Sequence, residues 1–527
     1  MNILLINIVL VLFTVFFYKK IRNGMHILQL GHYYNEPYFQ WQEENRAKIF
    51  KISEIVLLVV PILLLLVNQY TIAYIIEIAA LLLLILTTKR RTEKKPFVKT
   101  ARVKRQYITF LIILIAIFVL GNIYKDLITF IMVAVFSTLA YAMVSVVNII
   151  NLPIEQYINK QFCKKAKKKI EDMPNLDVIG ITGSYGKTSS KNILSDILNI
   201  KYNALPTPHN WNTYNGLIMT VNNYLDKFTD IFIAEMGAYV KGEIKGLCKL
   251  VKPQYGILTT IGTAHLETFG SEQNIIDGKF ELIESLPSDG IGVLNGDDEK
   301  QVNYDLKNNC KIVWIGIENE NVDVRALNIK CSNKGTHFDI MFKGDKKLYP
   351  FETRLLGNHN VYNILAAVAL GKEFGIDIPD LQAAVRGVKP VEHRLEIKKL
   401  GSFYMIDDAY NSNPVGAKGA VDVLGMMPGV KIVVTPGMIE LGKKEDEYNE
   451  IFGEQIAEVA DYVVLVGEEK TKPILQGLKN KNFDLEKIVV YNDVREAYKF
   501  INSISANSKK DVFALFENDL PDTYNEK

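Results

Sequence analysis

Apolar residues follow two different patterns along the chain, and the change comes near residue 151. Before it they form long, nearly uncharged blocks; after it they form short runs separated by Gly, Asp, Asn and Lys. Long blocks are typical of membrane-spanning helices, whereas short runs alternating with amphipathic stretches are typical of α/β domains. The pattern therefore predicts an N-terminal all-α transmembrane region followed by α/β structure.

The apolar blocks predict about five transmembrane helices. They are Asn2–Tyr18, Glu54–Val67, Ile72–Thr87, Tyr107–Leu120 and Leu127–Leu152. Between the first two, Met25–Phe50 is rich in Tyr, Trp, Gln and Glu, which favours an interfacial or re-entrant element, with a plain linker nearly as well supported. A cleaved signal peptide is disfavoured because positive charges follow the first block instead of preceding it.

Basic residues predict the orientation of these spans. If the spans alternate, Lys19–Arg22, Lys89–Lys95 and Lys160–Lys169 fall on one side, while the opposite loops carry only Lys125. The positive side of a membrane protein is usually cytoplasmic. We therefore expect a multi-pass protein of the cell membrane with its catalytic domains in the cytoplasm. The run Lys164–Lys169 is better explained by contact with anionic membrane lipid than by binding of nucleic acid. The net charge of +2 argues neither for nor against binding of nucleic acid.

The stretch after Leu176 predicts a phosphate loop between a buried strand and a helix over Thr188–Asn199. Its residues are Gly183, Ser184, Tyr185, Gly186, Lys187, Thr188 and Ser189. Glycines let successive backbone N–H groups and the helix N-terminus face an anion, while Lys187 can reach the outer phosphates and Thr188 can hold Mg²⁺. The usual eight-residue form has Gly at the position of Ile181, so this is a compact variant.

Short apolar runs after the loop predict a parallel sheet covered by helices on both faces. The candidate strands are Ile231–Ala234, Tyr255–Thr260, Gly292–Leu294 and Lys311–Ile315. Ligands of such sheets lie at the carboxyl ends of strands, which draws attention to Glu235, His265, Asp297 and Asp298. A second set of strands, Phe403–Ile406, Lys431–Thr435, Tyr462–Val466 and Lys487–Tyr491, predicts a smaller Rossmann-like domain.

The phosphate loop and the segments Ala234–Ala238 and Thr259–Gly270 together resemble the Mur ligase family, most closely its D-alanyl-D-alanine-adding members. The resemblance covers roughly Asp177 to Lys527. It implies ATP as cofactor and two Mg²⁺ ions, with Thr188, Glu235 and His265 among their ligands. It also implies that Lys279 is carried as a carbamate. An ordinary exposed lysine and a buried structural histidine are the alternatives for Lys279 and His265.

Further motifs resemble the nucleotide and substrate sites of that family. The element Leu355–Ala367 implies that Asn360 contacts the adenine, and Val391–Glu396 implies that Arg394 meets the phosphates. Asp408 is expected to be catalytic with Lys187, His265 and Lys279. The substrate-binding residues implied by the loops Thr207–Gly216 and Ile406–Pro414 are Thr207, Asn212, Thr213, Tyr410, Asn411 and Asn413.

Two segments depart from the family pattern. Pro436–Gly442 stands where D-alanyl-D-alanine-adding enzymes typically have G-D-M-x-E-L-G, and Phe516–Pro521 replaces their late K-G-S-R. Both lie where the incoming amine is expected, so its identity stays open.

The resemblance implies a membrane-anchored ligase of cell-wall synthesis. A carboxylate would be activated as an acyl-phosphate and then attacked by an amine, most simply D-alanyl-D-alanine added to a muramyl peptide. The first alternative is a ligase of the same family that acts on a lipid-linked acceptor or adds another amino acid such as glutamate. The second alternative is a membrane ATPase or a nucleotide-binding scaffold without ligase activity. The expected partners are the cell-wall precursor, an amino acid or dipeptide and membrane lipid, with no nucleic acid; the oligomeric state stays open. The predicted domains are residues 1–165, 166–393 and 394–527.

Overall fold

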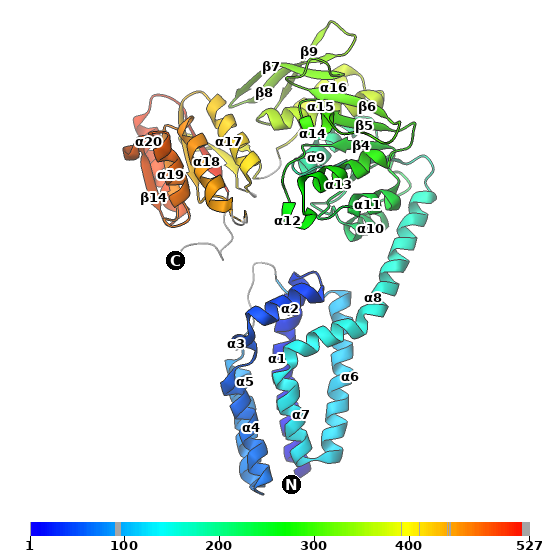
Figure 1. The fold of residues 1–527 in the computed structure, drawn as a ribbon, viewed down its shortest axis with the longest axis vertical. Coiled ribbons are helices and arrows are strands. Elements are labelled where there is room, and N and C mark those ends of the chain that lie inside the picture. The colour runs from blue at the N-terminus through cyan, green and yellow to red at the C-terminus, as the bar shows by residue number, and fades with distance from the viewer. Residues whose placement is uncertain are drawn as a thin grey trace. The chain divides into compact units, whose positions relative to one another are not determined.

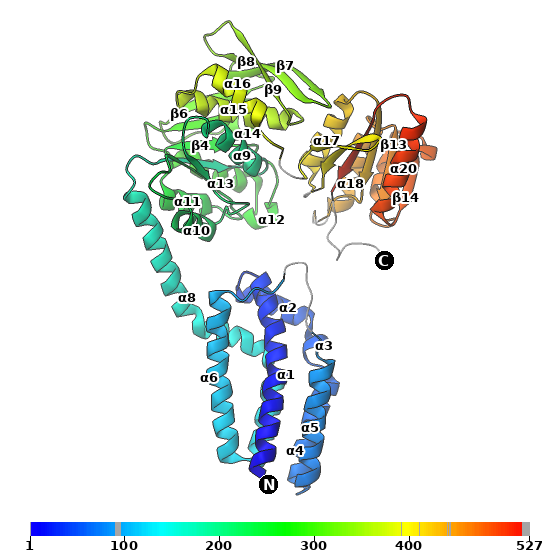
Figure 2. The ribbon, with the colours of Figure 1, turned by 180° about the vertical axis from the view of Figure 1, so that it is seen from behind.

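The computed structural model describes residues 2–89, 96–390, 393–409, 412–439, 441 and 444–518. The chain divides into two compact units, unit 1 over residues 1–161 and unit 2 over residues 162–527 (Figures 1 and 2). Each is considered by itself.

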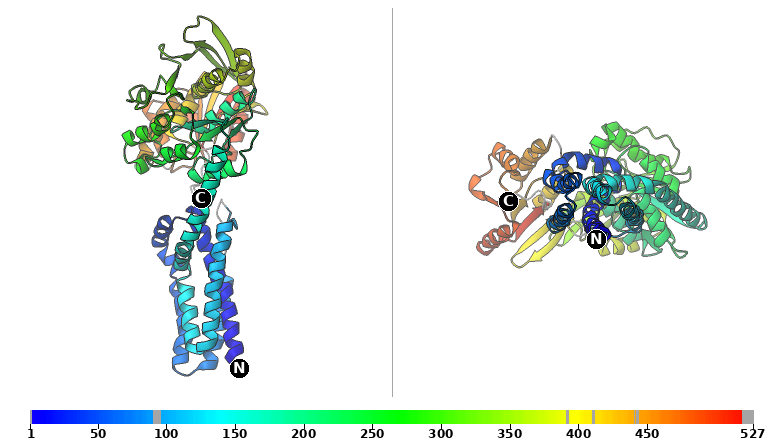
Figure 3. Two further views of the ribbon diagram at one scale, coloured as in Figure 1. Left: turned by 90° about the vertical axis from the view of Figure 1, so that its right-hand side faces the viewer. Right: turned by 90° about the horizontal axis from the view of Figure 1, so that it is seen from below.

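Unit 1 is all helical, as the apolar blocks predict, and its long helices run side by side (Figure 3, left). Its elements are α1 (Asn2–Leu30), α2 (Asn35–Glu44), α3 (Arg46–Ile49), α4 (Ile52–Leu66), α5 (Tyr70–Thr87), α6 (Ala101–Tyr124), α7 (Asp126–Thr138) and α8 (Ala140–Glu171), which ends in unit 2. Aromatic side chains fill the interior, where Phe17 stacks on Phe13 and meets the edge of Phe110. Ile112 and Ile115 lie exposed on the outer face of α6, as expected of a helix that faces lipid.

In the part of the chain that the structure describes, four helices are long and apolar enough to cross a membrane, or five if the bent pair α7 and α8 counts as one span. The predicted fifth span is therefore two helices joined at an 80° bend. The predicted start of a separate element at Met25 was wrong. Helix α1 continues to Leu30 because Ile21, Met25 and Leu28 keep a buried helical spacing. Only then do the short helices α2 and α3 follow.

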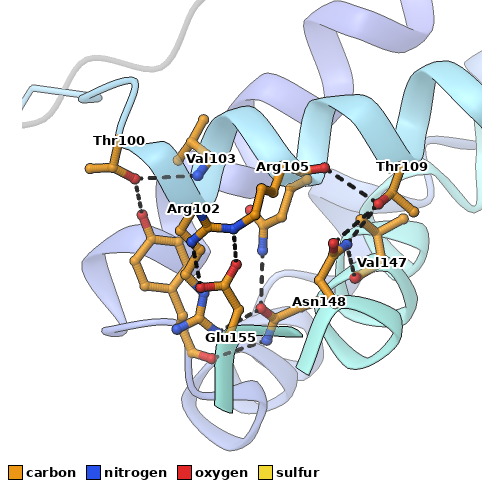
Figure 4. Close-up of polar contacts among 11 residues, drawn as sticks. Thr100, Arg102, Val103, Arg105, Thr109, Val147, Asn148 and Glu155 are labelled. Carbon is orange, nitrogen blue, oxygen red and sulfur yellow. Dashed lines mark hydrogen bonds and ion pairs between the residues drawn. The ribbon is translucent and has the colours of Figure 1, made fainter. Parts of the chain in front are cut away.

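A group of polar side chains, the α6–α8 network, joins two helices of unit 1 (Figure 4). Arg105 donates from Nε and Nη2 to the two carboxylate oxygens of Glu155, each at 2.7 Å. Asn148 Oδ1 accepts from Arg102 Nη2 at 3.1 Å and from Gln106 Nε2 at 3.0 Å. Glu155, Asn148 and Gln106 are buried, so these bonds replace the water that the groups lose.

Glu77 on α5 is also buried in unit 1, but its environment differs. Among the described residues, no hydrogen-bond partner reaches either of its carboxyl oxygens. An isolated carboxylate in such a place is costly, so the side chain is not explained by packing alone.

The central sheet of unit 2 has the strand order β2-β3-β1-β4-β5-β6-β7-β8-β9. Its strands are β1 (Asp177–Thr182), β2 (Ala204–Pro206), β3 (Ile231–Glu235), β4 (Tyr255–Leu258), β5 (Ile291–Asn295), β6 (Lys311–Gly316), β7 (Val324–Ser332), β8 (Gly335–Phe342) and β9 (Leu348–Thr353). Parallel pairing from β2 to β7 confirms the predicted doubly covered sheet. The antiparallel extension β7 to β9 had not been predicted.

Helices cover both faces of this sheet, giving two hydrophobic cores. The helices are α9 (Lys187–Leu198), α10 (Tyr214–Asn223), α11 (Glu243–Val251), α12 (Leu266–Phe269), α13 (Glu272–Glu284), α14 (Glu299–Val302), α15 (Asn358–Glu373) and α16 (Ile378–Gly387). One core lies under α9 and α15, the other under α10, α11 and α13.

The last turns of α8 belong to unit 2. Ala166 and Ile170 join the core beneath α10, and Asn222 Nδ2 donates to the carbonyl oxygen of Phe162 at 3.0 Å. The ligand-binding sheet is thus preceded by a helix that is part of the same hydrophobic core.

The smaller sheet has the order β10-β11-β15-β12-β13-β14, antiparallel only at β10. Its strands are β10 (Glu396–Leu400), β11 (Phe403–Asp408), β12 (Val430–Thr435), β13 (Tyr462–Val466), β14 (Ile488–Tyr491) and β15 (Val512–Glu517), with helices α17 (Pro414–Met426), α18 (Glu445–Ala457), α19 (Lys472–Asn480) and α20 (Val494–Asn507). This confirms the predicted Rossmann-like domain and adds β15 at its centre.

The two sheets of unit 2 meet at a small apolar contact. Leu356, two residues before α15, packs into the core of the smaller sheet with Val423 and Leu424 of α17. Next to it, Gly357 has φ +87°, and a Cβ atom there would lie 2.7 Å from Val423 Cγ2. The approach of α17 therefore depends on the absence of a side chain at Gly357.

Candidate functional site

The loop between β1 and α9 has the backbone that the sequence predicts for a phosphate loop. Gly183 has φ +153° and Gly186 has φ +81°, conformations that favour glycine. A Cβ on Gly183 would lie 1.9 Å from Thr259 Oγ1, so no larger residue fits. Helix α9 begins at Lys187, which puts Thr188 and Ser189 in its first turn with their N–H groups free of intrahelical partners.

The segment after β4 braces this loop. Thr259 Oγ1 donates to the Tyr185 carbonyl at 2.6 Å, and Ser184 Oγ donates to the Gly262 carbonyl at 3.0 Å. The Ser184 N–H donates to the carbonyl of Thr260 at 2.9 Å. The loop is thus held in place before any ligand arrives, which lowers the entropy cost of binding.

Lys187 folds back over its own loop. Its Nζ donates to the carbonyl oxygens of Gly183 at 2.7 Å and Ser184 at 3.1 Å. Burial, and then the positive charge of Arg394, lowers the pKa of Lys187, while the carboxylate of Glu235 opposes this. The ammonium therefore lies where an anion would both neutralise it and replace two carbonyl contacts.

Glu235 ends β3, beside the loop, and several polar groups converge on it. Its Oε1 accepts from Thr188 Oγ1 at 3.1 Å and from Asn212 Nδ2 at 3.0 Å. Lys191 Nζ lies 3.1 Å from Oε2 and also donates to the carbonyl of His209. Both Glu235 and Lys191 are 1% exposed. Sequence reasoning missed Lys191, although its spacing of four from Lys187 puts the two on one face of α9.

His265 directly precedes α12, and Lys279 lies on α13. His265 is exposed, has φ +63° and meets Tyr239 edge to face at 4.5 Å. Lys279 is 2% exposed; its Nζ lies 3.5 Å from the Ala238 carbonyl and 5.4 Å from the Phe269 ring centre. Burial, followed by the charge of Lys187, lowers the pKa of Lys279 to about 7. Loss of hydration, then the charges of Lys279 and Lys187, lowers the pKa of His265. The positive charge of Lys187 thus acts on both Lys279 and His265.

These residues fit a magnesium ion in part. Thr188 and Glu235 supply hard oxygen donors, and the buried Oε2 of Glu235 is paired with the Lys191 ammonium at 3.1 Å. No set of three His, Cys, Asp or Glu side chains gathers around a common point in the described part of the chain. An unmodified Lys279 would repel a second ion, whereas a carbamate on its nitrogen would supply the missing anionic oxygens.

The predicted substrate loop reaches the same place. Thr207 Oγ1 accepts from the N–H of Glu235 at 3.2 Å, and Asn212 contacts the Glu235 carboxylate. Thr213 is exposed and caps α10 by accepting from the Gly216 N–H at 3.3 Å. Thr207 and Asn212 are therefore brought to the phosphate loop, while Thr213 lies beside them at the surface.

The two asparagines of the α15 motif have different surroundings. Asn360 is buried and donates from Nδ2 to the Leu356 carbonyl at 2.9 Å, so part of its bonding capacity is used within the fold. Asn363 Oδ1 accepts from Ser190 Oγ at 2.7 Å and faces Gly186. Asn363 thus supports the phosphate loop, a role that the motif alone had not indicated.

Asp297 and Asp298, which also follow a strand, are fully used by the fold. Asp297 accepts from the backbone N–H groups of Ile317, Glu318 and Asn319 and from the Tyr362 hydroxyl. Asp298 Oδ2 accepts from the Ile261 N–H at 3.0 Å. Their carboxylates organise loops and leave little capacity for a ligand.

In the smaller domain, Asp408 lies at the end of β11 and accepts from the Leu395 N–H at 3.1 Å. Asn413 caps α17 through its bond to the Gly416 N–H at 3.0 Å. Tyr410 and Asn411 lie outside the described residues. The positive charge of Arg394 acts on both Asp408 and Lys187.

Comparison with known proteins agrees with this arrangement. Residues 181–371 match the Mur ligase middle domain, and residues 393–515 match the Mur ligase glutamate ligase domain. The UDP-N-acetylmuramoyl-tripeptide–D-alanyl-D-alanine ligase of Bacillus subtilis is 32% identical over 344 residues, which cover 64% of this chain and 72% of that enzyme. The Escherichia coli enzyme of the same name is 33% identical over 297 residues, 55% of this chain and 65% of its own.

Solved structures are similar in the same way. A crystal structure of MurF from Acinetobacter baumannii has a TM-score of 0.60 and 27% identity, covering 68% of this chain and 76% of that one. MurF of Thermotoga maritima in complex with ADP has a TM-score of 0.58 and 26% identity, covering 68% and 80%.

Proposed function

Because the chain belongs to the Mur ligase family, we propose that it joins D-alanyl-D-alanine to the carboxylate of a muramyl peptide at the expense of ATP. It is an ATP-dependent ligase that forms C–N bonds. The observation that carries the proposal is the convergence of Thr188, Lys191 and Asn212 on Glu235 at the end of β3, beside the phosphate loop. That arrangement puts a phosphate cradle, a metal ligand and a substrate loop in contact.

The roles of individual residues follow from these positions. We assign the triphosphate to the loop residues Gly183 to Ser189, with Asn360 and Arg394 completing the nucleotide site. Thr188, Glu235, His265 and carbamylated Lys279 would hold Mg²⁺, and Lys187, His265, Lys279 and Asp408 would act in catalysis. The acceptor and amine would contact Thr207, Asn212, Thr213, Tyr410, Asn411 and Asn413.

Magnesium ions, when bound, would neutralise the phosphate oxygens and align the γ-phosphate with the acceptor carboxylate. Lys187 would leave the carbonyls of Gly183 and Ser184 to bind the transferred phosphoryl group, so that charge is stabilised by a group already in position. Asn212 would hold the acceptor loop against Glu235. Closure of the smaller domain through Arg394 would keep water from the acyl-phosphate.

We further propose that unit 1 anchors the enzyme in the cell membrane, with unit 2 in the cytoplasm and domains near residues 1–165, 166–393 and 394–527. The length and apolar composition of its helices support this, together with the one-sided basic clusters. Single cysteines introduced at Gln69 and Asn122 should be labelled by a membrane-impermeant thiol reagent in intact cells, whereas one at Thr88 should not. Labelling at Thr88 alone would reverse the orientation.

The form of the acceptor can be tested with the detergent-solubilised full chain. It would be given matched uridine-linked and lipid-linked muramyl tripeptides with ATP and D-alanyl-D-alanine, and glutamate would serve as a competing amine. Because unit 1 stands where a soluble substrate-binding domain is expected in this family, we expect the lipid-linked acceptor to be used at least as well. A shortened chain beginning at Phe162 is the control, since it keeps Ala166 and Ile170 in the core. Equal use of both acceptors by both chains would limit unit 1 to anchoring.

Release of phosphate separates the ligase from other nucleotide-binding proteins. A ligase requires both acceptor and amine for rapid release, and we expect omission of either to suppress it. Amine-independent release would indicate a membrane ATPase, and nucleotide binding without release a scaffold.

A further inference from the structure

Lys191 is a fully buried lysine to which the proposed mechanism assigns no role. It lies on α9, one turn beyond Lys187, and is 1% exposed. Lysine is almost never buried to this extent unless its ammonium has a partner. The Lys191 ammonium lies 3.1 Å from Glu235 Oε2 and donates to the carbonyl oxygen of His209. One partner belongs to the proposed metal site and the other to the predicted substrate loop, so Lys191 lies between the two.

The contacts of Glu235 show what this ammonium does for the carboxylate. Oε1 accepts from two neutral donors, Thr188 Oγ1 and Asn212 Nδ2, whereas Oε2 has Lys191 alone among the described residues. A carboxylate with partners on both oxygens is held in one orientation. Without Lys191, the charge of a side chain that is 1% exposed would lose the cation in contact with it. Lys191 therefore both orients the Glu235 carboxylate and compensates its charge.

His209 shows what the same ammonium does for the substrate loop. Its φ of +46° lies in the left-handed region, which residues other than Gly, Asn and Asp rarely adopt. Its carbonyl oxygen bonds to Lys191 while its side chain is exposed. Three residues later, Asn212 bonds to the Glu235 side chain, and its carbonyl accepts from the Gly237 N–H at 2.7 Å. Lys191 thus holds a strained turn of a loop that is already fixed to the end of β3.

Two simpler roles do not account for these contacts of Lys191. A lysine that binds phosphate or substrate directly needs access to solvent, and Lys191 has almost none. A purely structural ion pair could use any nearby carboxylate. This one uses the carboxylate that we assign to Mg²⁺, together with a carbonyl of the substrate loop.

We propose that Lys191 is a positioning residue that couples the metal site to the substrate loop. Its ammonium is the counter-ion of Glu235 before a metal ion binds, and its bond to His209 holds the loop against the same carboxylate. Lys191 itself touches neither ATP nor the acceptor. The inference deepens the proposed ligase function and rests on it for the identity of the acceptor.

The position of Lys191 has a consequence for metal binding. Its ammonium repels a divalent cation that approaches the same carboxylate, whereas the negative charge of the ATP triphosphate offsets this repulsion. We therefore expect the wild type to bind Mg²⁺ weakly by itself and tightly together with ATP. Removal of the ammonium should allow Glu235 to bind the ion without nucleotide.

A stability measurement on the full chain in detergent tests this expectation without any assay of activity. Lys191→Met keeps an apolar side chain of similar length but leaves Glu235 buried without a cation. We expect its Tm in EDTA to be lower than that of the wild type. Addition of MgCl₂ without nucleotide should raise the Tm of Lys191→Met by at least about twice as much as that of the wild type. An equal response of the two proteins would overturn the counter-ion role.

Two further variants control this measurement. Lys249→Met removes an exposed lysine of α11, and its Tm and its response to Mg²⁺ should equal those of the wild type. The double variant Lys191→Met with Glu235→Gln removes both charges, so it should regain Tm in EDTA and lose the additional response to Mg²⁺. If Lys191→Met does not fold in EDTA, we expect MgCl₂ to restore its folding. Failure to fold in both conditions, while the double variant folds, would overturn the inference.

A kinetic measurement tests the coupling to the substrate loop. At saturating ATP and Mg²⁺, Lys191→Met should raise the KM of the muramyl tripeptide acceptor by about 10-fold or more, because the loop loses its bond at His209. The KM of D-alanyl-D-alanine should stay within about 2-fold of the wild-type value, since both partners of Lys191 lie in the larger domain. A lower kcat with both KM values unchanged would overturn the coupling.

The two measurements separate failure of this inference from failure of the proposed function. If the wild type joins D-alanyl-D-alanine to neither the uridine-linked nor the lipid-linked acceptor, the proposed function fails. The additional response of Lys191→Met to Mg²⁺ would still establish Lys191 as the counter-ion of Glu235. If Lys191→Met instead has wild-type KM values and a wild-type response to Mg²⁺, the inference fails and the proposed function stands.

Discussion

Unit 1 and unit 2 both bury charged side chains, but the bonds that these side chains make are different. In unit 1, Arg105 and Glu155 form two short bonds that use both carboxylate oxygens and tie α6 to α8. In unit 2, Glu517 Oε2 is buried and accepts no hydrogen bond from the described residues, and Glu235 Oε2 meets only the ammonium of Lys191. A buried charge with saturated bonds holds helices together, whereas one with spare capacity at the end of a strand marks a place for a ligand.

Loss of the phosphate-loop lysine should have the largest effect on function and little effect on stability. In Lys187→Ala, the carbonyls of Gly183 and Ser184 lose a donor that water can replace, but the triphosphate loses its main cation. We expect ATP binding to be lost and turnover to fall by about 100-fold or more. Binding of a fluorescent ATP analogue and the Tm measure the two effects. Retained ATP binding would contradict the assignment.

Lys279→Ala should separate nucleotide binding from chemistry. Removal of the carbamate nitrogen leaves the phosphate loop intact, so ATP should still bind while amide formation is abolished. Added acetate should restore part of the activity by filling the vacated ligand position. Lys241→Ala is the control, because Lys241 is an exposed lysine near the same helix. Full activity of Lys279→Ala without acetate would exclude the carbamate.

Disruption of the α6–α8 network should lower the stability of the chain and leave its chemistry unchanged, the reverse of the effect expected for Lys187→Ala. Arg105→Ala leaves buried Glu155 without its cation, which typically costs about 3 kcal/mol of folding free energy. We expect a lower Tm in detergent and unchanged ligase turnover by the chain that remains folded. The double variant Arg105→Met with Glu155→Leu should recover much of the Tm, since it removes both charges. A selective loss of activity at normal Tm would mean that this network serves unit 2.

Replacement of Glu77 is expected to have the smallest effect. It tests the comparison of the two units directly, because Glu77 is buried in unit 1 and yet its carboxyl oxygens accept no hydrogen bond from the described residues. If it is only an unpaired group, Glu77→Met should keep or raise the Tm and leave turnover with a lipid-linked acceptor unchanged. Thr14→Val is a polar-to-apolar control, because Thr14 is a half-buried residue of α1 whose hydroxyl bonds only within its own helix, to the Leu10 carbonyl. Loss of turnover with the lipid-linked acceptor alone would make Glu77 a functional residue of unit 1.

Hydrophobic pattern predicted most of the fold, because long apolar helices and parallel strands leave a clear period in the sequence. The β7 to β9 extension and β15 were missed, since strands such as Val324–Ser332 have one solvated face and mix polar with apolar residues. The start of α2 was misplaced because α1 continues past its basic residues to Leu30.

The candidate site could be predicted only where a local motif exists. Lys187 and Thr188 follow directly from the glycine loop, and Glu235 from its place after a strand. Lys191 and Glu517 could not be found in this way, because their partners are far away in sequence. Glu517 meets Asp408 only through the pairing of β11 with β15, which brings together residues more than a hundred positions apart.

The bare α-carbon of Gly357 has a mechanical consequence. Because a methyl group there would press against Val423 of α17, replacement by alanine would act as a wedge between the two sheets of unit 2. The wedge would touch neither the phosphate loop nor Asp408, yet it would hold their domains apart. If the two domains close as proposed, the distance of their closest approach would depend on the single hydrogen atom that Gly357 carries in place of a side chain.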